Sequence, residues 1–139
     1  MMIRSVQRKL GKLATFARML PYKKSLRSPT PTFIEIEPTT RCNATCGTCS
    51  RSSIASDKLK VDLSLTTTKK ILETFPDLTF IRLIGLGEVF LNPQIEDILK
   101  LFKERSIKVW IITNGSLLRN EKVRRLIHQY IYDVGISID

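Results

Sequence analysis

The stretch FIEIEPTTRCNATCGTC, residues 33–49, places a short predicted strand directly before a loop that carries all three cysteines of the chain. The apolar and β-branched start of residues 33–37 predicts the strand. Cys42, Cys46 and Cys49 follow with the spacing C-x3-C-x2-C. An odd number of cysteines within eight residues does not make the disulfide framework of a secreted domain. Three thiolates on one loop instead predict a soft metal centre with one coordination position left open.

Zinc fits this ligand count as well as an iron centre does. A structural zinc site with three cysteines needs a histidine near them. The single histidine of the chain, His128, lies far along the sequence, and we expect it on the surface of a helix. The cysteine loop therefore predicts a metal site without naming the metal.

Beyond the cysteine loop, the sequence alternates between helices and strands. β-branched and aromatic residues predict strands over residues 79–84, 108–113 and 134–139. Apolar residues at three- and four-residue steps predict three helices, which begin after Asp62 or Ser64, at Asn92-Pro93, and after Asn120. Strands that alternate with helices of this length pair in parallel through right-handed crossovers. The sequence thus predicts an α/β fold built from parallel βα repeats.

The unusual residues follow the carboxyl ends of the predicted strands. The cysteine loop follows the first strand, and the later strands are followed by Gly85-Leu86-Gly87-Glu88, by Thr113-Asn114-Gly115, and by Ser137 and Asp139. Ligands bind at this edge in parallel βα folds. Glycine lets a backbone approach a ligand closely, and a carboxylate suits an ammonium group. We therefore expect one site here; a plain turn at residues 85–88 and a solvent-facing strand end at residues 137–139 are the alternatives.

Two further polar positions belong to the same region. Asn114 by itself is a turn residue that precedes Gly115. Glu35 and Glu37 lie on one side of the first strand. In a barrel, carboxylates on an inward side bind substrate or partner a cation, and a solvated strand edge is the alternative.

The net charge of +10 is concentrated near the start of the chain. Residues 1–28 hold eight cations and no acid, whereas the remainder holds fifteen cations and thirteen acids. Residues 1–20 predict a basic amphipathic helix and residues 21–32 a proline-containing linker. A helix packed on the domain or a semi-ordered arm, a weak membrane-surface contact and a transit peptide are the open interpretations. The basicity predicts no nucleic-acid binding by the rest of the chain.

The sequence also bears on the compartment. No apolar run approaches the roughly 18–20 residues of a membrane span. The first twenty residues lack the uninterrupted apolar segment of a secretory signal. With its clustered cysteines, the chain is expected in the reducing cytoplasm.

The cysteine spacing, set in residues 34–43, resembles the opening of the radical S-adenosylmethionine (radical SAM) superfamily, and more narrowly its SPASM-associated branch. The resemblance covers roughly residues 32–139, and it implies the first half to two-thirds of a partial TIM-like barrel, with residues 33–139 as a truncated core domain. It implies that Cys42, Cys46 and Cys49 bind a 4Fe–4S cluster whose fourth iron is chelated by S-adenosylmethionine. It further assigns Gly85, Gly87 and Glu88 to the methionine amino group, and Ser137 and Asp139 to the ribose or the methionine carboxylate.

The resemblance implies an enzyme that reductively cleaves S-adenosylmethionine to a 5′-deoxyadenosyl radical. An electron donor, either a flavodoxin or a ferredoxin, and a substrate of unknown identity are the expected partners. Because the substrate-binding half is absent from these 139 residues, we expect a truncated form without independent turnover. The alternatives are a small iron–sulfur electron-transfer module and a zinc-binding module, neither with substrate chemistry.

Overall fold

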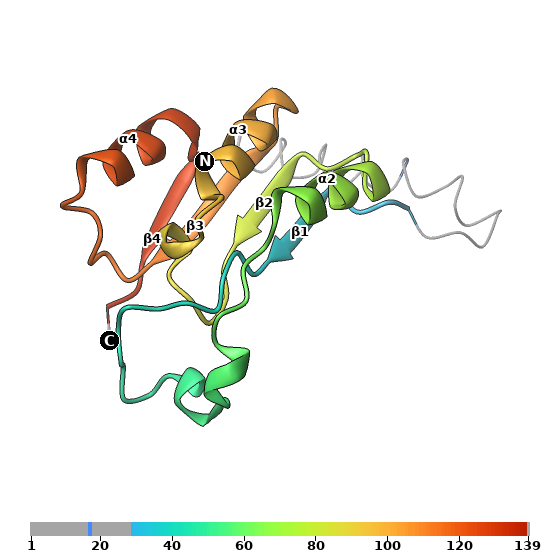
Figure 1. The fold of residues 1–139 in the computed structure, drawn as a ribbon. Helices are drawn as coiled ribbons and strands as arrows, with labels where there is room; N and C mark the ends of the chain where they lie inside the picture. The colour runs from blue at the N-terminus through green and yellow to red at the C-terminus, as the bar shows by residue number, and fades with distance from the viewer. Residues whose placement is uncertain (1–16, 18–28, 139) are drawn as a thin grey trace, which may run out of the picture. The chain divides into compact units, whose positions relative to one another are not determined.

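The computed structural model describes residue 17 and residues 29–138. The predicted helix over residues 1–20 (Ala17 apart), most of the predicted linker, and Asp139 lie outside the described residues. From Pro31 onward, the chain forms one compact unit. Its strands are β1 (Phe33–Ile36), β2 (Phe80–Leu83), β3 (Lys108–Thr113) and β4 (Asp133–Ile136), and its helices are α2 (Leu65–Thr74), α3 (Ile95–Glu104) and α4 (Glu121–Tyr130) (Figure 1).

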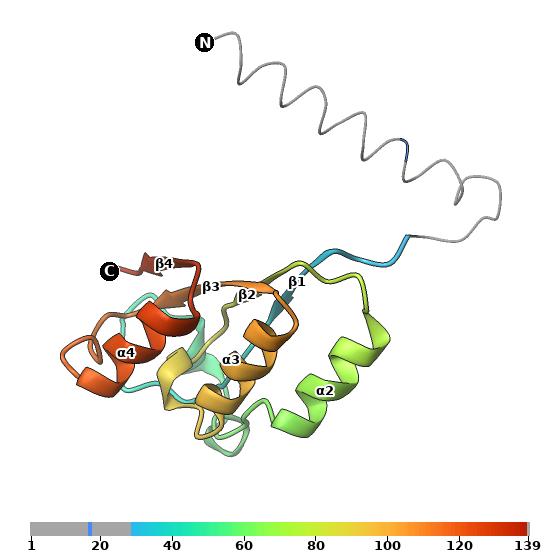
Figure 2. The same cartoon turned by 90° about the horizontal axis from the view of Figure 1, so that it is seen from above.

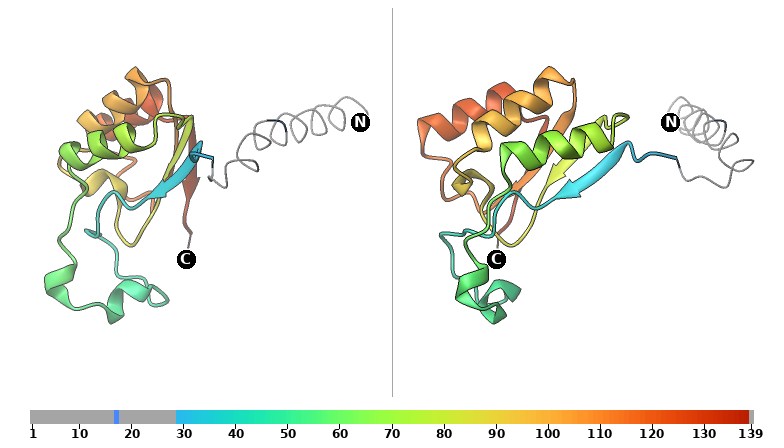
Figure 3. Two further views of the ribbon diagram at one scale, coloured as in Figure 1. Left: turned by 90° about the vertical axis from the view of Figure 1, so that its right-hand side faces the viewer. Right: turned by 45° about the vertical axis from the view of Figure 1, so that its right-hand side comes forward.

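The four strands pair in parallel in the order β1-β2-β3-β4. The three helices cover the same face of the sheet (Figures 2 and 3). A doubly wound sheet reverses its strand order and carries helices on both faces, whereas a barrel wall proceeds strand by strand with its helices outside. The predicted α/β fold with the winding of a partial barrel is therefore confirmed.

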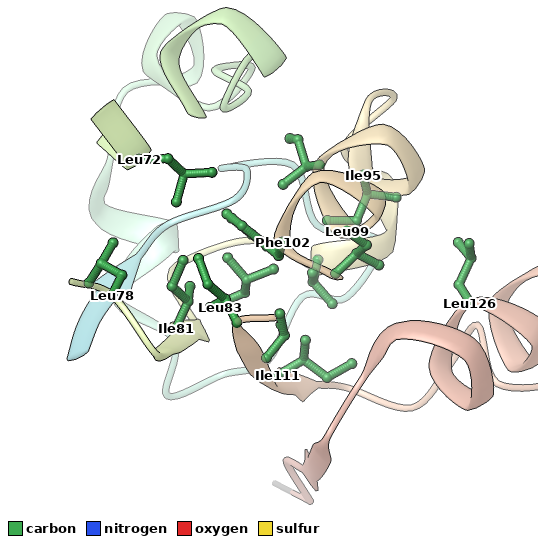
Figure 4. Close-up of a cluster of buried hydrophobic side chains, with 13 residues drawn as sticks. Leu72, Leu78, Ile81, Leu83, Ile95, Leu99, Phe102, Ile111 and Leu126 are labelled. Carbon is green, nitrogen blue, oxygen red and sulfur yellow. The ribbon is translucent and has the colours of Figure 1, made fainter. Parts of the chain in front are cut away.

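The core lies between the helices and the sheet (Figure 4). Its fully buried apolar side chains come from both strands and helices: Ile81, Leu83, Ile98, Leu99, Phe102 and Ile111. Burial of each contributes roughly 1.5–3 kcal/mol. Along β3, buried residues alternate with exposed or half-buried ones, so one side of the strand faces the helices and the other faces the barrel interior.

Two of the three helices begin where the sequence predicts. The Ser64 hydroxyl accepts the N–H of Thr67 (3.0 Å) at the start of α2. The Asn120 side chain accepts the N–H groups of Lys122 (2.8 Å) and Val123 (3.4 Å) at the start of α4. Both side chains satisfy donors that have no partner within their helix.

The predicted start of α3 at Asn92-Pro93 is wrong, since the helix begins at Ile95 with Gln94 as its N-cap. Asn92 is buried, and its Nδ2 donates to the carbonyls of Pro38 (2.6 Å) and Leu63 (2.9 Å). Its Oδ1 accepts the N–H of Gln94 (2.7 Å). The local sequence indicates a cap, but Asn92 instead joins three segments in front of the helix.

A polar and aromatic layer covers the sheet face opposite the helices. Arg82 on β2 forms an ion pair with Glu35 on β1. Its guanidinium lies 4.8 Å from the centroid of the Trp110 ring, within the range of a cation–π contact. Glu35 thus partners a cation, which was one of the expected roles for this side of the strand.

Candidate functional site

A pocket of about 460 Å³ opens at the carboxyl ends of the strands, where all four strand-end loops contribute to its wall. Its predicted members are Cys42, Cys46, Gly85, Gly87, Glu88 and Ser137. Ile84, directly after β2, and Ile112 and Ile136, on β3 and β4, add apolar surface. The structure therefore brings together six of the eight residues that are predicted to bind a metal or a cofactor. Cys49 lines a separate, smaller pocket that also includes Cys46, and Asp139 lies outside the described residues.

The cysteine loop is closed at its base by residues from both of its ends. Thr39 and Asp62 form an isolated antiparallel bridge, and the Thr39 hydroxyl donates to Asp62 Oδ1 (2.6 Å). Arg41 Nε donates to both carboxylate oxygens of Asp62, at 3.1 and 2.9 Å. Such a charge-assisted pair is stronger than a neutral hydrogen bond. The segment of residues 40–61 in Figure 1, which extends beyond the strand ends, therefore starts and finishes at one anchored point.

The two glycines after β2 lie against the segment that leads into the cysteine loop. A β-carbon on Gly87 would overlap the backbone carbonyls of Thr39 and Arg41. One on Gly85 would overlap the side chain of Glu37, which also accepts the N–H of Leu86 (2.5 Å). The glycines thus allow the loop over residues 85–88 to pack directly against the chain before the first cysteine.

Glu88 connects this loop to the end of β3. Its side chain is 1% exposed. Oε1 accepts the hydroxyl of Thr113 (2.7 Å), and Oε2 accepts the backbone N–H of Asn114 (2.8 Å). Each carboxylate oxygen keeps a further lone pair for another donor. The carboxylate is therefore held at the pocket wall by β3.

The three cysteines are unpaired and half-buried. The Cys42 sulfur accepts the N–H of Ala44 (3.4 Å) and Nδ2 of Asn114 (3.8 Å). Within residue 17 and residues 29–138, no three His, Cys, Asp or Glu side chains lie close enough together to hold a metal ion. His128 is exposed on α4, as expected. The thiols therefore share one loop, but they do not converge on a point.

Sequence reasoning missed the polar residues that surround Cys42. Asn114 was expected at this edge of the sheet with the role of a turn residue, and its Oδ1 does accept the N–H of Ser116 (2.9 Å) beside Gly115, whose φ is +74°. The same side chain also reaches Cys42 and Asn43. The signal available in the sequence is the position of Asn114 directly after a strand, at the edge where the cysteines lie.

Among the residues that the structure describes, no helix is both long and apolar enough to cross a lipid bilayer.

Among the proteins that resemble the chain are two curated relatives and two solved structures. The tungsten-containing aldehyde ferredoxin oxidoreductase cofactor-modifying protein of Pyrococcus furiosus is 32% identical over 110 residues, which make up 77% of this chain and 30% of the relative. The antilisterial bacteriocin subtilosin biosynthesis protein AlbA of Bacillus subtilis is 32% identical over 113 residues, or 80% of this chain and 25% of AlbA. The chain therefore spans less than a third of either relative's length.

Both of these solved structures are of BtrN. The complex with AdoMet and 2-DOIA superposes with a TM-score of 0.67 at 21% identity, over 79% of this chain and 46% of BtrN. The open conformation superposes with a TM-score of 0.64 at 21% identity, over 79% of this chain and 51% of BtrN. These matches show a shared fold over about half of BtrN. The sequence model of the Radical SAM superfamily matches residues 36–139, which is most of the chain, so the chain belongs to the radical SAM superfamily.

Proposed function

We propose that the chain binds a 4Fe–4S cluster through Cys42, Cys46 and Cys49, and S-adenosylmethionine in the adjacent pocket. The observation that carries the proposal is the pocket of about 460 Å³, which joins the cysteine loop to the ends of β2, β3 and β4. Its volume falls within the roughly 300–1,000 Å³ of small-molecule sites. Radical SAM membership supplies the cofactor class.

The donor set fits an iron–sulfur cluster. Thiolates are the usual protein ligands of such clusters. The chain supplies three cysteines, all unpaired, on a loop whose base is anchored through Asp62. Three cysteines would leave one coordination position of the cluster for another ligand, and Cys42 and Cys46 line the pocket that would supply it. Because metal binding is coupled to the ordering of its ligands, we expect the three thiols to converge as the cluster assembles.

The remaining pocket residues would bind and orient S-adenosylmethionine. The backbone of Gly85 and Gly87 and the carboxylate of Glu88 suit the methionine amino group, because all three lie at one wall and an acid complements an ammonium group. Ser137 lines the pocket, and the radical SAM resemblance supports a role for Ser137 and Asp139 at the ribose or the methionine carboxylate. Ile84, Ile112 and Ile136 would exclude water from the reacting region.

When bound, the cluster and S-adenosylmethionine supply one-electron cleavage to methionine and a 5′-deoxyadenosyl radical. A flavodoxin or a ferredoxin would deliver the electron. The two curated relatives act in different processes by their names, and the chain spans less than a third of each. We therefore assign cofactor chemistry and no substrate.

The test compares Cys46→Ala with Thr48→Ala, an exposed position on the same loop. After anaerobic reconstitution, wild type and Thr48→Ala should each hold about four iron and four sulfide per chain, and Cys46→Ala should lose the cluster. Full iron content in Cys46→Ala would overturn the ligand assignment. Zinc without sulfide in the wild type would favour the zinc-binding alternative, and an intact cluster that does not respond to S-adenosylmethionine would favour the electron-transfer alternative.

A further inference from the structure

Asn114 connects three segments of the pocket wall. Its backbone N–H donates to Glu88 Oε2 (2.8 Å). Its Nδ2 donates to Asn43 Oδ1 (3.0 Å) and to the sulfur of Cys42 (3.8 Å). Its Oδ1 accepts both the N–H (2.9 Å) and the hydroxyl (2.6 Å) of Ser116. One residue after β3 thus contacts both the cysteine loop and the loop after β2.

The surrounding donors fix the direction of the Asn114 amide. A backbone N–H can only donate, so the group that faces the N–H of Ser116 must be the amide oxygen. The hydroxyl of Ser116 also donates to this oxygen, and it accepts Nδ2 of Asn43 (2.8 Å) with a lone pair. Every donor in this ring meets an acceptor only if the NH₂ group of Asn114 points to Cys42 and Asn43. The hydrogen-bond network therefore fixes the orientation of the Asn114 amide.

The contact singles out one cysteine. Within residues 29–138, Cys42 is the cysteine whose sulfur accepts hydrogen bonds, one from the N–H of Ala44 and one from Asn114. Donors directed at a cysteine sulfur stabilise its negative charge. In a cluster, they favour the reduced, more electron-rich state, and hydrogen bonds to the sulfurs are among the features that set the reduction potential.

We propose that Asn114 is a positioning residue that holds Cys42 and raises the reduction potential of the cluster. The inference rests on the proposed function, because it needs the cluster to be bound through Cys42. A higher potential eases the uptake of the electron that the cofactor chemistry requires. Ala44 contributes its backbone N–H regardless of its side chain, so Asn114 is the donor that substitution can remove.

Two variants separate this role from the role of Asn114 in the turn. Asn114→Ala removes the amide altogether. Asn114→Ser keeps a short side-chain oxygen that can accept the N–H of Ser116, adds no charge, and is too short to donate to Cys42. Asn120→Ala is the matched control, because it removes an asparagine that caps α4 and does not line the cluster pocket.

The measurement is an EPR-monitored redox titration of the anaerobically reconstituted full chain. We expect a more negative midpoint potential in both Asn114→Ala and Asn114→Ser, and the wild-type potential in Asn120→Ala. A purely structural role would leave Asn114→Ser at the wild-type potential, and that result would overturn the inference. Failure of the wild type to take up a cluster would instead overturn the proposed function, and the inference with it.

Discussion

Gly87 lies where the loop after β2 presses against the backbone that leads into the cysteine loop. The N–H of the next residue, Glu88, donates to the carbonyl of Arg41 (2.7 Å), so the two segments are fixed to each other. A β-carbon at Gly87 would overlap the carbonyls of Thr39 and Arg41, and backbone cannot move aside as the end of a flexible side chain can. Only a residue without a β-carbon therefore fits at this contact.

We predict that Gly87→Ala lowers the free energy of unfolding by about 1–3 kcal/mol, the usual cost of forcing extra atoms into a packed site. Gly47→Ala is the matched control on the cysteine loop, since nothing lies within 4 Å of its added β-carbon. Urea denaturation of the cluster-free chain measures both changes. Equal stability of the two variants would show that Gly87 is not packed closely against the backbone of Thr39 and Arg41.

The sequence indicates which residues matter at this scale, but not what each one contacts. Gly87 and Glu88 were expected to receive a cofactor, and both do line the pocket. Glu88, however, is also held by Thr113, 25 residues further along the chain. That partner depends on the pairing of β2 with β3, which places the two strand ends side by side. A motif read along the chain contains no such information.

At the scale of elements, strands and helices were predictable because their signals are local. The strand over residues 108–113 was predicted with the bounds that the structure shows. The caps at Ser64 and Asn120 each rest on a side chain and the next few N–H groups. Asn92 carries the same type of signal, yet its Nδ2 bonds to carbonyls 54 and 29 residues away. Tertiary contacts therefore decided the start of α3.

We predict that Asn92→Ala destabilises the fold by at least about 2 kcal/mol, because the carbonyls of Pro38 and Leu63 and the N–H of Gln94 lose their partner in a buried place. Asn120→Ala should cost only about 1 kcal/mol, the value of a lost N-cap. Thermal unfolding of both variants checks the difference. A smaller loss for Asn92→Ala than for Asn120→Ala would mean that Asn92 is an ordinary cap after all.

The contact between α3 and α4 predicts a pH dependence. Hydrogen bonds from Lys122 on α4, and then from Lys100 on α3, hold the pKa of Glu96 below its ordinary value of 4.5. A carboxyl whose pKa is lowered by folding adds stability above its unfolded pKa and loses it as the pH falls through the folded value. The effect is small, since the pair is exposed to solvent.

We expect Lys122→Met to reduce the loss of stability of the chain below pH 4.5, while Lys69→Met, an exposed position on α2, leaves that loss unchanged. Denaturant midpoints measured from pH 3 to pH 7 at low salt test this. An unchanged pH profile in Lys122→Met would show that Lys122 does not lower the pKa of Glu96. The profile should also flatten in high salt.

For the whole molecule, the parallel order of the strands predicted where the residues of the site come together. Four loops that are distant in sequence follow four neighbouring parallel strands, so their residues had to share one edge. The sequence could not supply the anchoring of that edge, which uses Asp62, Glu37 and Asn114 from different segments. On the sheet face opposite the helices, the sequence predicted the carboxylates of β1. It did not predict that Arg82 lies over the ring of Trp110.

We propose that the cysteine loop and the pocket beside it form one site for a 4Fe–4S cluster and S-adenosylmethionine. The most direct measurement is the EPR spectrum of the anaerobically reconstituted, dithionite-reduced chain, with and without S-adenosylmethionine. We predict a 4Fe–4S signal whose g-values shift when S-adenosylmethionine is added, because the cofactor reaches the open iron position. A cluster signal that is identical in both samples, or no cluster signal at all, would contradict the claim.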